Sequence, residues 1–81
     1  MYTQKIIDRL DDIYGKGRGM GVYTRIMPGI LADFDRMLKK AVIGKKVSEQ
    51  YNLEDGKGII LVSGTKKANG QSEIDMDVIK S

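Results

Sequence analysis

The chain contains neither cysteine nor histidine among its 81 residues. Without cysteine it can form no disulfide bond, and without either residue type the common zinc sites are excluded. The commonest general base of enzymes is missing as well, because that role falls most often to histidine. A chain free of cysteine suits a reducing compartment, so we expect a cytoplasmic protein.

Aromatic residues and long hydrophobic runs are also scarce. One Phe, four Tyr and no Trp leave little material for an aromatic platform on which nucleic-acid bases stack. No apolar run approaches the roughly 20 residues of a membrane-spanning helix. The first residues also lack the apolar core of a signal peptide. We therefore expect an intracellular protein that does not bind a membrane.

The sequence offers no catalytic group in place of the missing histidine and cysteine. Its serines belong to no nucleophile motif, and a chain of this length has limited scope for a water-excluding pocket of about 300 Å³ or more. We predict a protein that is not an enzyme and needs no cofactor. The serines are Ser48, Ser63, Ser72 and Ser81.

Length and charge indicate a small, mildly basic domain. Eighty-one residues form a single domain, residues 1–81. A core of this size alone rarely supplies more than about 3–5 kcal/mol, so self-association into a homo-oligomer is the obvious supplement; a well-packed monomer is the alternative. The formal net charge of +3, from 14 basic and 11 acidic side chains, permits an anionic partner without requiring one.

The stretch Gly58–Lys80 has the clearest pattern in the chain: an apolar run, an Asn-Gly pair and then strict alternation. Asn69-Gly70 predicts a β-hairpin with a two-residue type I′ turn, because both residues adopt positive φ readily. In that register Leu61 faces Val78 on the core side of the ribbon, and Ile60 faces Ile79 on the other side. The residues predicted on the core side are Leu61, Ile74, Met76 and Val78.

The rest of the chain predicts two helices and one short strand. Apolar residues repeat at helical spacing over Thr3–Tyr14 and over Ile30–Ile43. Val22–Ile26 is rich in β-branched and aromatic residues, which favours a strand. Pro28 suits the first turn of the helix that follows.

Residues 45–57 are ambiguous, because Val47 and Tyr51 lie four apart and fit one or two helical turns. Together the elements predict an α+β fold in the order α-β-α-β-β. We expect two amphipathic helices packed on a small, mostly antiparallel sheet that ends in a β-hairpin.

Four consecutive apolar residues, Ile59–Val62, are typical of a strand that is covered on both faces. Two helices would leave part of one face uncovered. We therefore predict an oligomer or protein interface that includes Ile60, Val62 and Ile79.

A glycine-rich basic segment follows the first helix, with glycine at every second position from Gly15 to Gly21. Its backbone amides could approach an anion, and its side chains add positive charge. The simpler interpretation is a mobile connection between elements. The residues predicted to contact an anion here are Lys16, Gly17, Arg18 and Gly19, with Arg25 close behind.

Lysines gather around the end of the second predicted helix, where they complement the helix dipole. They could also extend a phosphate-binding surface if the fold brings them near the glycine loop. These lysines are Lys39, Lys40, Lys45 and Lys46.

Three carboxylates, Glu73, Asp75 and Asp77, alternate along the last predicted strand. Three such groups could hold a hard cation, but no second ligand cluster accompanies them. A solvent face that protects an edge strand is the simpler interpretation, and we predict no metal site.

These observations favour a small non-catalytic binding module whose partner is nucleic acid or a protein. Nucleic acid is slightly favoured because of the basic glycine loop. The first alternative is an accessory or inhibitor protein of the kind that phages and mobile elements encode, acting through protein–protein contacts. The second is a binder of a nucleotide or small phosphorylated ligand at a subunit interface.

Overall fold

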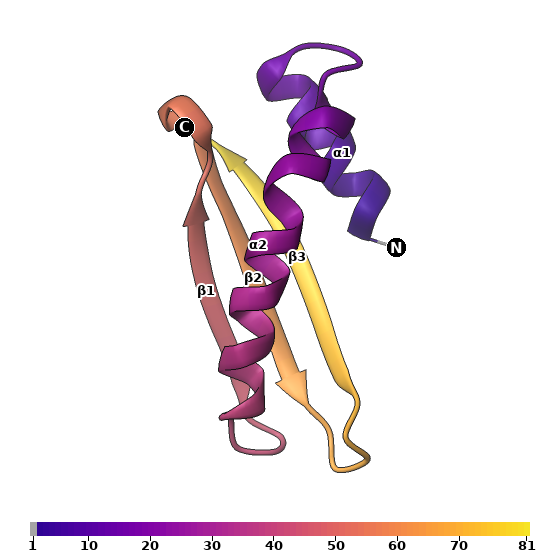
Figure 1. The fold of residues 1–81 in the computed structure, drawn as a ribbon, viewed down its shortest axis with the longest axis vertical. Coiled ribbons are helices and arrows are strands. Elements are labelled where there is room, and N and C mark those ends of the chain that lie inside the picture. Colours follow the sequence, from indigo (N-terminus) through magenta and orange to yellow (C-terminus); the bar gives the residue numbers. More distant parts are fainter. Residues whose placement is uncertain (1) are drawn as a thin grey trace.

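The chain starts with two consecutive helices and ends with three consecutive strands. A computed structural model describes residues 2–81 (Figure 1). The strands form one antiparallel sheet in the order β1-β2-β3. The predicted α+β class is confirmed, although the order is α-α-β-β-β. The elements are α1 (Tyr2–Tyr14), α2 (Gly19–Lys39), β1 (Lys46–Asn52), a 3-10 turn (Glu54–Gly56), β2 (Gly58–Lys66) and β3 (Ser72–Lys80).

Helix α2 begins at Gly19 and ends at Lys39, instead of running from Ile30 to Ile43. The predicted mobile loop is only a short turn between the helices, and the predicted strand Val22–Ile26 is helical. Pro28 lies inside the helix, where an interior proline costs about 3 kcal/mol. Burial of a continuous apolar stripe on both sides of the proline offsets that cost. The buried apolar residues of the stripe are Val22, Met27, Ile30, Phe34 and Leu38.

Residues 46–52 form a strand and not the helical turns that the spacing of Val47 and Tyr51 allows. Burial alternates from one residue to the next along β1. Val47 and Tyr51 pack against the core, and the Tyr51 hydroxyl donates a 2.6 Å hydrogen bond to Asp33 Oδ2 of α2. Burial of the Tyr51 ring and that hydrogen bond raise the pKa of the hydroxyl.

The β2–β3 hairpin exists, but its register differs by one residue from the prediction. The loop has three residues, because Lys67 N donates to Gln71 O (2.8 Å) and Gly70 N donates to Lys67 O (3.0 Å). Gly70 has a φ of +85°, whereas Asn69 does not have the positive φ that a type I′ turn requires. A three-residue loop with glycine in the left-handed region is the next common hairpin connection.

The shifted register exchanges the two faces of β2. Ile60 pairs with Val78 and Val62 pairs with Met76. Ile60 and Val62 are 0% and 1% exposed, at the centre of the core, so they do not form the uncovered surface that we predicted. Leu61 lies on the opposite face, outside the buried core, although Met76 and Val78 are buried as predicted.

Both helices pack on the face of the sheet that holds Ile60 and Val62. Ile6 and Leu10 of α1 join Phe34 of α2 in the same core cluster. In Figure 1, α2 runs along the sheet over β2, while α1 lies near the C-terminal end of β3. No helix covers the opposite face within residues 2–81, and Ile79 on that face is 47% exposed.

Candidate nucleic-acid interface

Three backbone amides at the turn between α1 and α2 already have partners within the chain. Gly15 N donates to Asp11 O (2.9 Å) and Arg18 N donates to Gly15 O (3.0 Å). The first amide of α2, Gly19 N, donates to Asp11 Oδ1 at 2.6 Å. A carboxylate of α1 therefore already binds the first amide of this helix N-terminus, where a phosphate would also bind.

Gly19 serves helix packing. It is buried, and a Cβ atom there would collide with the Ile7 carbonyl oxygen and lie 2.8 Å from Asp11 N. Lys16 and Gly17 remain exposed in the turn, and Arg18 is exposed beside them. The predicted anion-contacting group thus divides into exposed residues and one residue that the helix contact requires.

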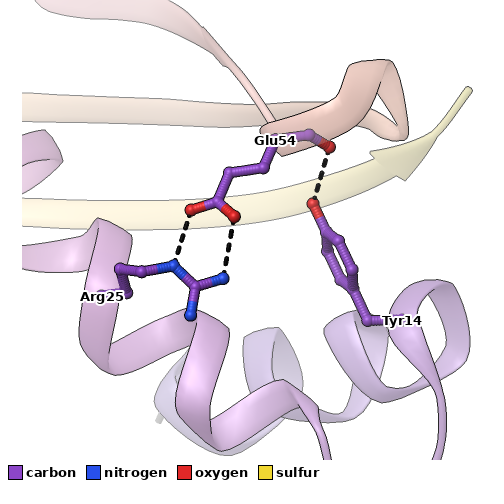
Figure 2. Close-up of polar contacts among 3 residues, drawn as sticks. All are labelled: Tyr14, Arg25 and Glu54. Carbon is purple, nitrogen blue, oxygen red and sulfur yellow. Dashed lines mark hydrogen bonds and ion pairs between the residues drawn. The ribbon is translucent and has the colours of Figure 1, made fainter.

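Arg25 is held by an ion pair (Figure 2). Its guanidinium donates two 2.8 Å hydrogen bonds to the Glu54 carboxylate. The Glu54 carbonyl oxygen accepts a 3.0 Å hydrogen bond from the Tyr14 hydroxyl. The contact with Arg25 lowers the pKa of the Glu54 carboxyl, and burial raises the pKa of Tyr14. These contacts fasten the β1–β2 turn to both helices.

A hollow of about 330 Å³ lies beside this ion pair, between the α1–α2 turn and the β1–β2 turn. Arg18 and Arg25 line it, but so do the carboxylates of Glu54 and Asp55. Mixed charge of this kind suits a phosphorylated ligand poorly, because each nearby carboxylate repels it.

The opposite end of the molecule collects lysines from three segments. The end of α2 and the loop after it contribute three, the start of β1 contributes one, and the β2–β3 hairpin contributes two. The hairpin is held there by two contacts: Gly44 N donates to Lys66 O (2.8 Å) and Lys66 Nζ donates to Lys39 O (3.2 Å). We call this surface the lysine end: Lys39, Lys40, Lys45, Lys46, Lys66 and Lys67.

Most of the charge at the lysine end is not neutralised. Lys39 pairs with Asp35 (3.3 Å) and Lys67 pairs with Glu73 (2.6 Å). The remaining four lysines make no ion pair within residues 2–81. They are Lys40, Lys45, Lys46 and Lys66.

Two exposed apolar side chains lie in the loop that belongs to the lysine end. Val42 is 69% exposed and Ile43 is 54% exposed. They lie in the loop between α2 and β1, with a pair of lysines on each side in the sequence. We call these two exposed residues the apolar tip.

The fold does not bring the two predicted basic groups together. The α1–α2 turn and the lysine end lie at opposite ends of α2 (Figure 1). A helix of 21 residues is about 30 Å long, well beyond the screening length of about 8 Å at physiological salt. The two groups thus form separate sites.

Sequence reasoning missed Lys66, Lys67 and the apolar tip. The helical spacing over Ile30–Ile43 predicts that Val42 lies in the second helix, whereas α2 ends at Lys39. The two lysines precede the Asn-Gly pair, but only the return of the hairpin to the end of α2 places them beside the other four. The repeated Lys-Lys pairs around Ala41–Gly44 were the available signal.

The carboxylates of β3 do not converge. Within residues 2–81, no three acidic side chains come together where they could hold a metal ion. Glu73 pairs with Lys67, and Asp77 lies 3.9 Å from Lys5 and Arg9 of α1.

Among residues 2–81, neither helix has both the length and the apolar character that crossing a membrane requires.

Comparisons with protein-family models, with curated proteins and with solved structures find no match to this chain.

Proposed function

We propose that this protein is a small non-catalytic module that binds the phosphate backbone of nucleic acid through its lysine end. The observation that carries the proposal is the convergence of four lysines without an ion pair from three places: the loop after α2, the start of β1 and the hairpin. The lysines near the C-terminus of α2 also face the negative end of the helix dipole, which accounts for part of their placement. Lys45, Lys46 and Lys66 lie outside that helix, so the dipole alone does not account for the cluster.

The chemistry of the surface favours backbone contact over base recognition. Lysine ammonium groups bind phosphates as point charges and release counterions. No aromatic side chain belongs to the lysine end, so bases have no platform on which to stack. The apolar tip, Val42 and Ile43, would contact sugars or bases in a groove, where proteins insert aliphatic side chains. We expect weak sequence preference and strong salt dependence.

The test compares two double variants from opposite ends of the molecule. Lys40→Ala with Lys45→Ala removes two unpaired charges from the lysine end, and Lys16→Ala with Arg18→Ala removes two from the α1–α2 turn. Both lower the net charge equally, so a general charge effect is the same in each. We expect the first to weaken binding to unrelated DNA and RNA sequences alike and to reduce the salt slope by up to about two. The second should bind like the parent.

Fluorescence anisotropy over a range of salt concentrations measures both quantities. Thermal unfolding checks that all variants fold, since surface substitutions usually change stability by less than about 0.5 kcal/mol. Absence of parent binding at low salt would refute the proposal. Equal losses in the two double variants would show that only net charge matters and would refute the assigned site.

A protein partner is the second candidate, as an accessory or inhibitor protein. The observation in its favour is the uncovered sheet face, which carries Ile79 and the carboxylates of β3. Purification from the native host with and without nuclease separates the two candidates. A protein partner stays bound after nuclease treatment, whereas a nucleic-acid partner is lost.

A further inference from the structure

The uncovered face of the sheet has an ordered chemical pattern. Residues of the three strands lie side by side in four rows, set by the pairing of β1 with β2 and of β2 with β3. We call this surface the open face. From the hairpin end, its rows are Lys46–Thr65–Glu73, Ser48–Ser63–Asp75, Gln50–Leu61–Asp77 and Asn52–Ile59–Ile79.

Each strand contributes a different set of side chains to the open face. Counted from the hairpin end, the first three open-face residues of β3 are carboxylates. The first three open-face residues of β1 are hydrogen-bond donors: lysine, serine and glutamine. The central strand offers short hydroxyl residues and then Leu61 and Ile59, which are partly exposed. Two hollows of about 510 and 490 Å³ meet at Ser63, where the side chains are short.

We propose that two copies of this chain pack their open faces together, with a twofold axis parallel to the strands. Such a rotation places β1 of each copy over β3 of the other and β2 over β2. Ser48 then meets Asp75 of the second copy, and Gln50 meets Asp77. Lys46 meets Glu73 at the hairpin end. A twofold interface is self-complementary, and here every carboxylate meets a donor.

The charge pattern excludes the other simple arrangement. A twofold axis in the plane of the sheet but perpendicular to the strands would place β3 over β3. Asp75 would then meet Asp75, and Glu73 would meet Asp77, so like charges would face each other at an interface. Only the axis parallel to the strands places a carboxylate opposite a donor in each of the first three rows.

The row Ser48–Ser63–Asp75 should contribute most to the stability of the dimer. Glu73 and Asp77 have basic neighbours in their own chain, whereas Asp75 has no ion pair within residues 2–81. Packed sheets cross at about 30°, so the central rows stay closest and the end rows diverge. The Ser48–Asp75 contact is therefore the one on which the dimer should depend most.

The area predicts a weak dimer. Three strands about 4.8 Å apart and seven residues long give a footprint on the order of 350 Å² per copy. That places the interface among the small ones, and we expect dissociation in the micromolar range. The axis keeps the hairpin ends of both copies on the same side, so the two lysine ends lie next to each other. Dimerisation itself does not depend on nucleic acid.

The test substitutes Ser48 in two opposite ways. Ser48→Lys supplies Asp75 of the second copy with a cation, twice per dimer because of the symmetry, and should tighten dimerisation by roughly three- to tenfold. Ser48→Asp opposes two carboxylates and should weaken it by a similar factor. Net charge alone predicts the reverse, because Ser48→Lys raises a charge that is already +3.

Sedimentation equilibrium without nucleic acid, from low micromolar to about millimolar protein, measures the association constant. Leu61→Lys, on the open face and outside the buried core, should leave a folded monomer. Three results would overturn the proposal: a monomeric parent at about millimolar concentration, a dimer that Leu61→Lys does not weaken, or a Ser48→Lys dimer weaker than the Ser48→Asp dimer. The second would indicate pairing through the exposed edge of β1, and the first would leave the face to a different protein.

Discussion

Gly19 is the position where one added methyl group should do most harm at the contact between the helices. It is the first residue of α2 and is packed directly on the backbone of α1. A Cβ atom there would collide with the Ile7 carbonyl oxygen and lie 2.6 Å from Asp11 Oδ1 and 2.8 Å from Asp11 N. Backbone atoms cannot rotate away, so Gly19→Ala must push the two helices apart.

The expected loss of stability in Gly19→Ala is the sum of two unfavourable terms and one favourable term. Overpacking of this kind typically costs about 1–3 kcal/mol. Separation of the helices also strains the 2.6 Å hydrogen bond from Gly19 N to the Asp11 carboxylate, and a bond to a charged group is worth about 1.5–3 kcal/mol. Alanine is the better helix former by up to about 1 kcal/mol. We expect a net loss of roughly 2–4 kcal/mol.

Gly21→Ala is the matched control, because it makes the same change two residues further along the same helix. A Cβ atom at Gly21 meets nothing within 4 Å, so only the helix propensity remains. For a domain of this size, 1 kcal/mol moves the midpoint of thermal unfolding by about 4–8 °C. Gly19→Ala should therefore melt roughly 10–25 °C below the parent, and Gly21→Ala at or a few degrees above it. If both variants melt at the same temperature, the close helix contact at Gly19 is refuted.

Two further predictions concern the hairpin and the buried tyrosine. Gly70→Val should destabilise the protein by about 1–2 kcal/mol, because Gly70 has a φ of +85°, which a β-branched residue resists; Gly70→Asn should be tolerated much better, and equal melting of the two variants would contradict the turn. Tyr51 has a raised pKa because of burial and its hydrogen bond to Asp33, so its stabilising contribution is complete below the unfolded value of about 10 and is lost as pH rises above it. Tyr51→Phe should lower stability near neutral pH by about 1.5–3 kcal/mol, because the lost hydrogen bond is to a carboxylate. It should also flatten the decline above about pH 10, which urea unfolding at several pH values would measure; an unchanged decline would contradict this role.

The sequence by itself determined the features that depend on local periodicity. Helix α1 follows from the repeat of Ile6, Leu10 and Ile13, and its predicted range is almost the observed one. The hairpin follows from the Asn-Gly pair between two strand-like segments, and Met76 and Val78 are buried as predicted. These elements were predictable because their signals come from neighbours in the chain.

The tertiary structure decided the secondary structure of two segments for which the local sequence pattern is misleading or fits helix and strand equally well. Pro28 predicts the first turn of a helix that starts there, but burial of Val22 and Phe34 along one face makes a single helix that continues on both sides of the proline. Val47 and Tyr51 share a face in a helix and in a strand alike, because four residues are about one helical turn and also two strand repeats. Only the neighbouring strand β2, which pairs with this segment throughout, selects the strand.

The candidate site depended most on the tertiary structure. One extra residue in the hairpin loop moved Ile60 and Val62 into the core and Leu61 onto the open face, since side chains alternate along a strand. The length of α2 placed Lys16 and Arg18 about 30 Å from the lysines that follow the helix. The sequence determined how many basic residues the chain has, but which of them share a surface depends on contacts between distant segments, and these exist only in the folded molecule.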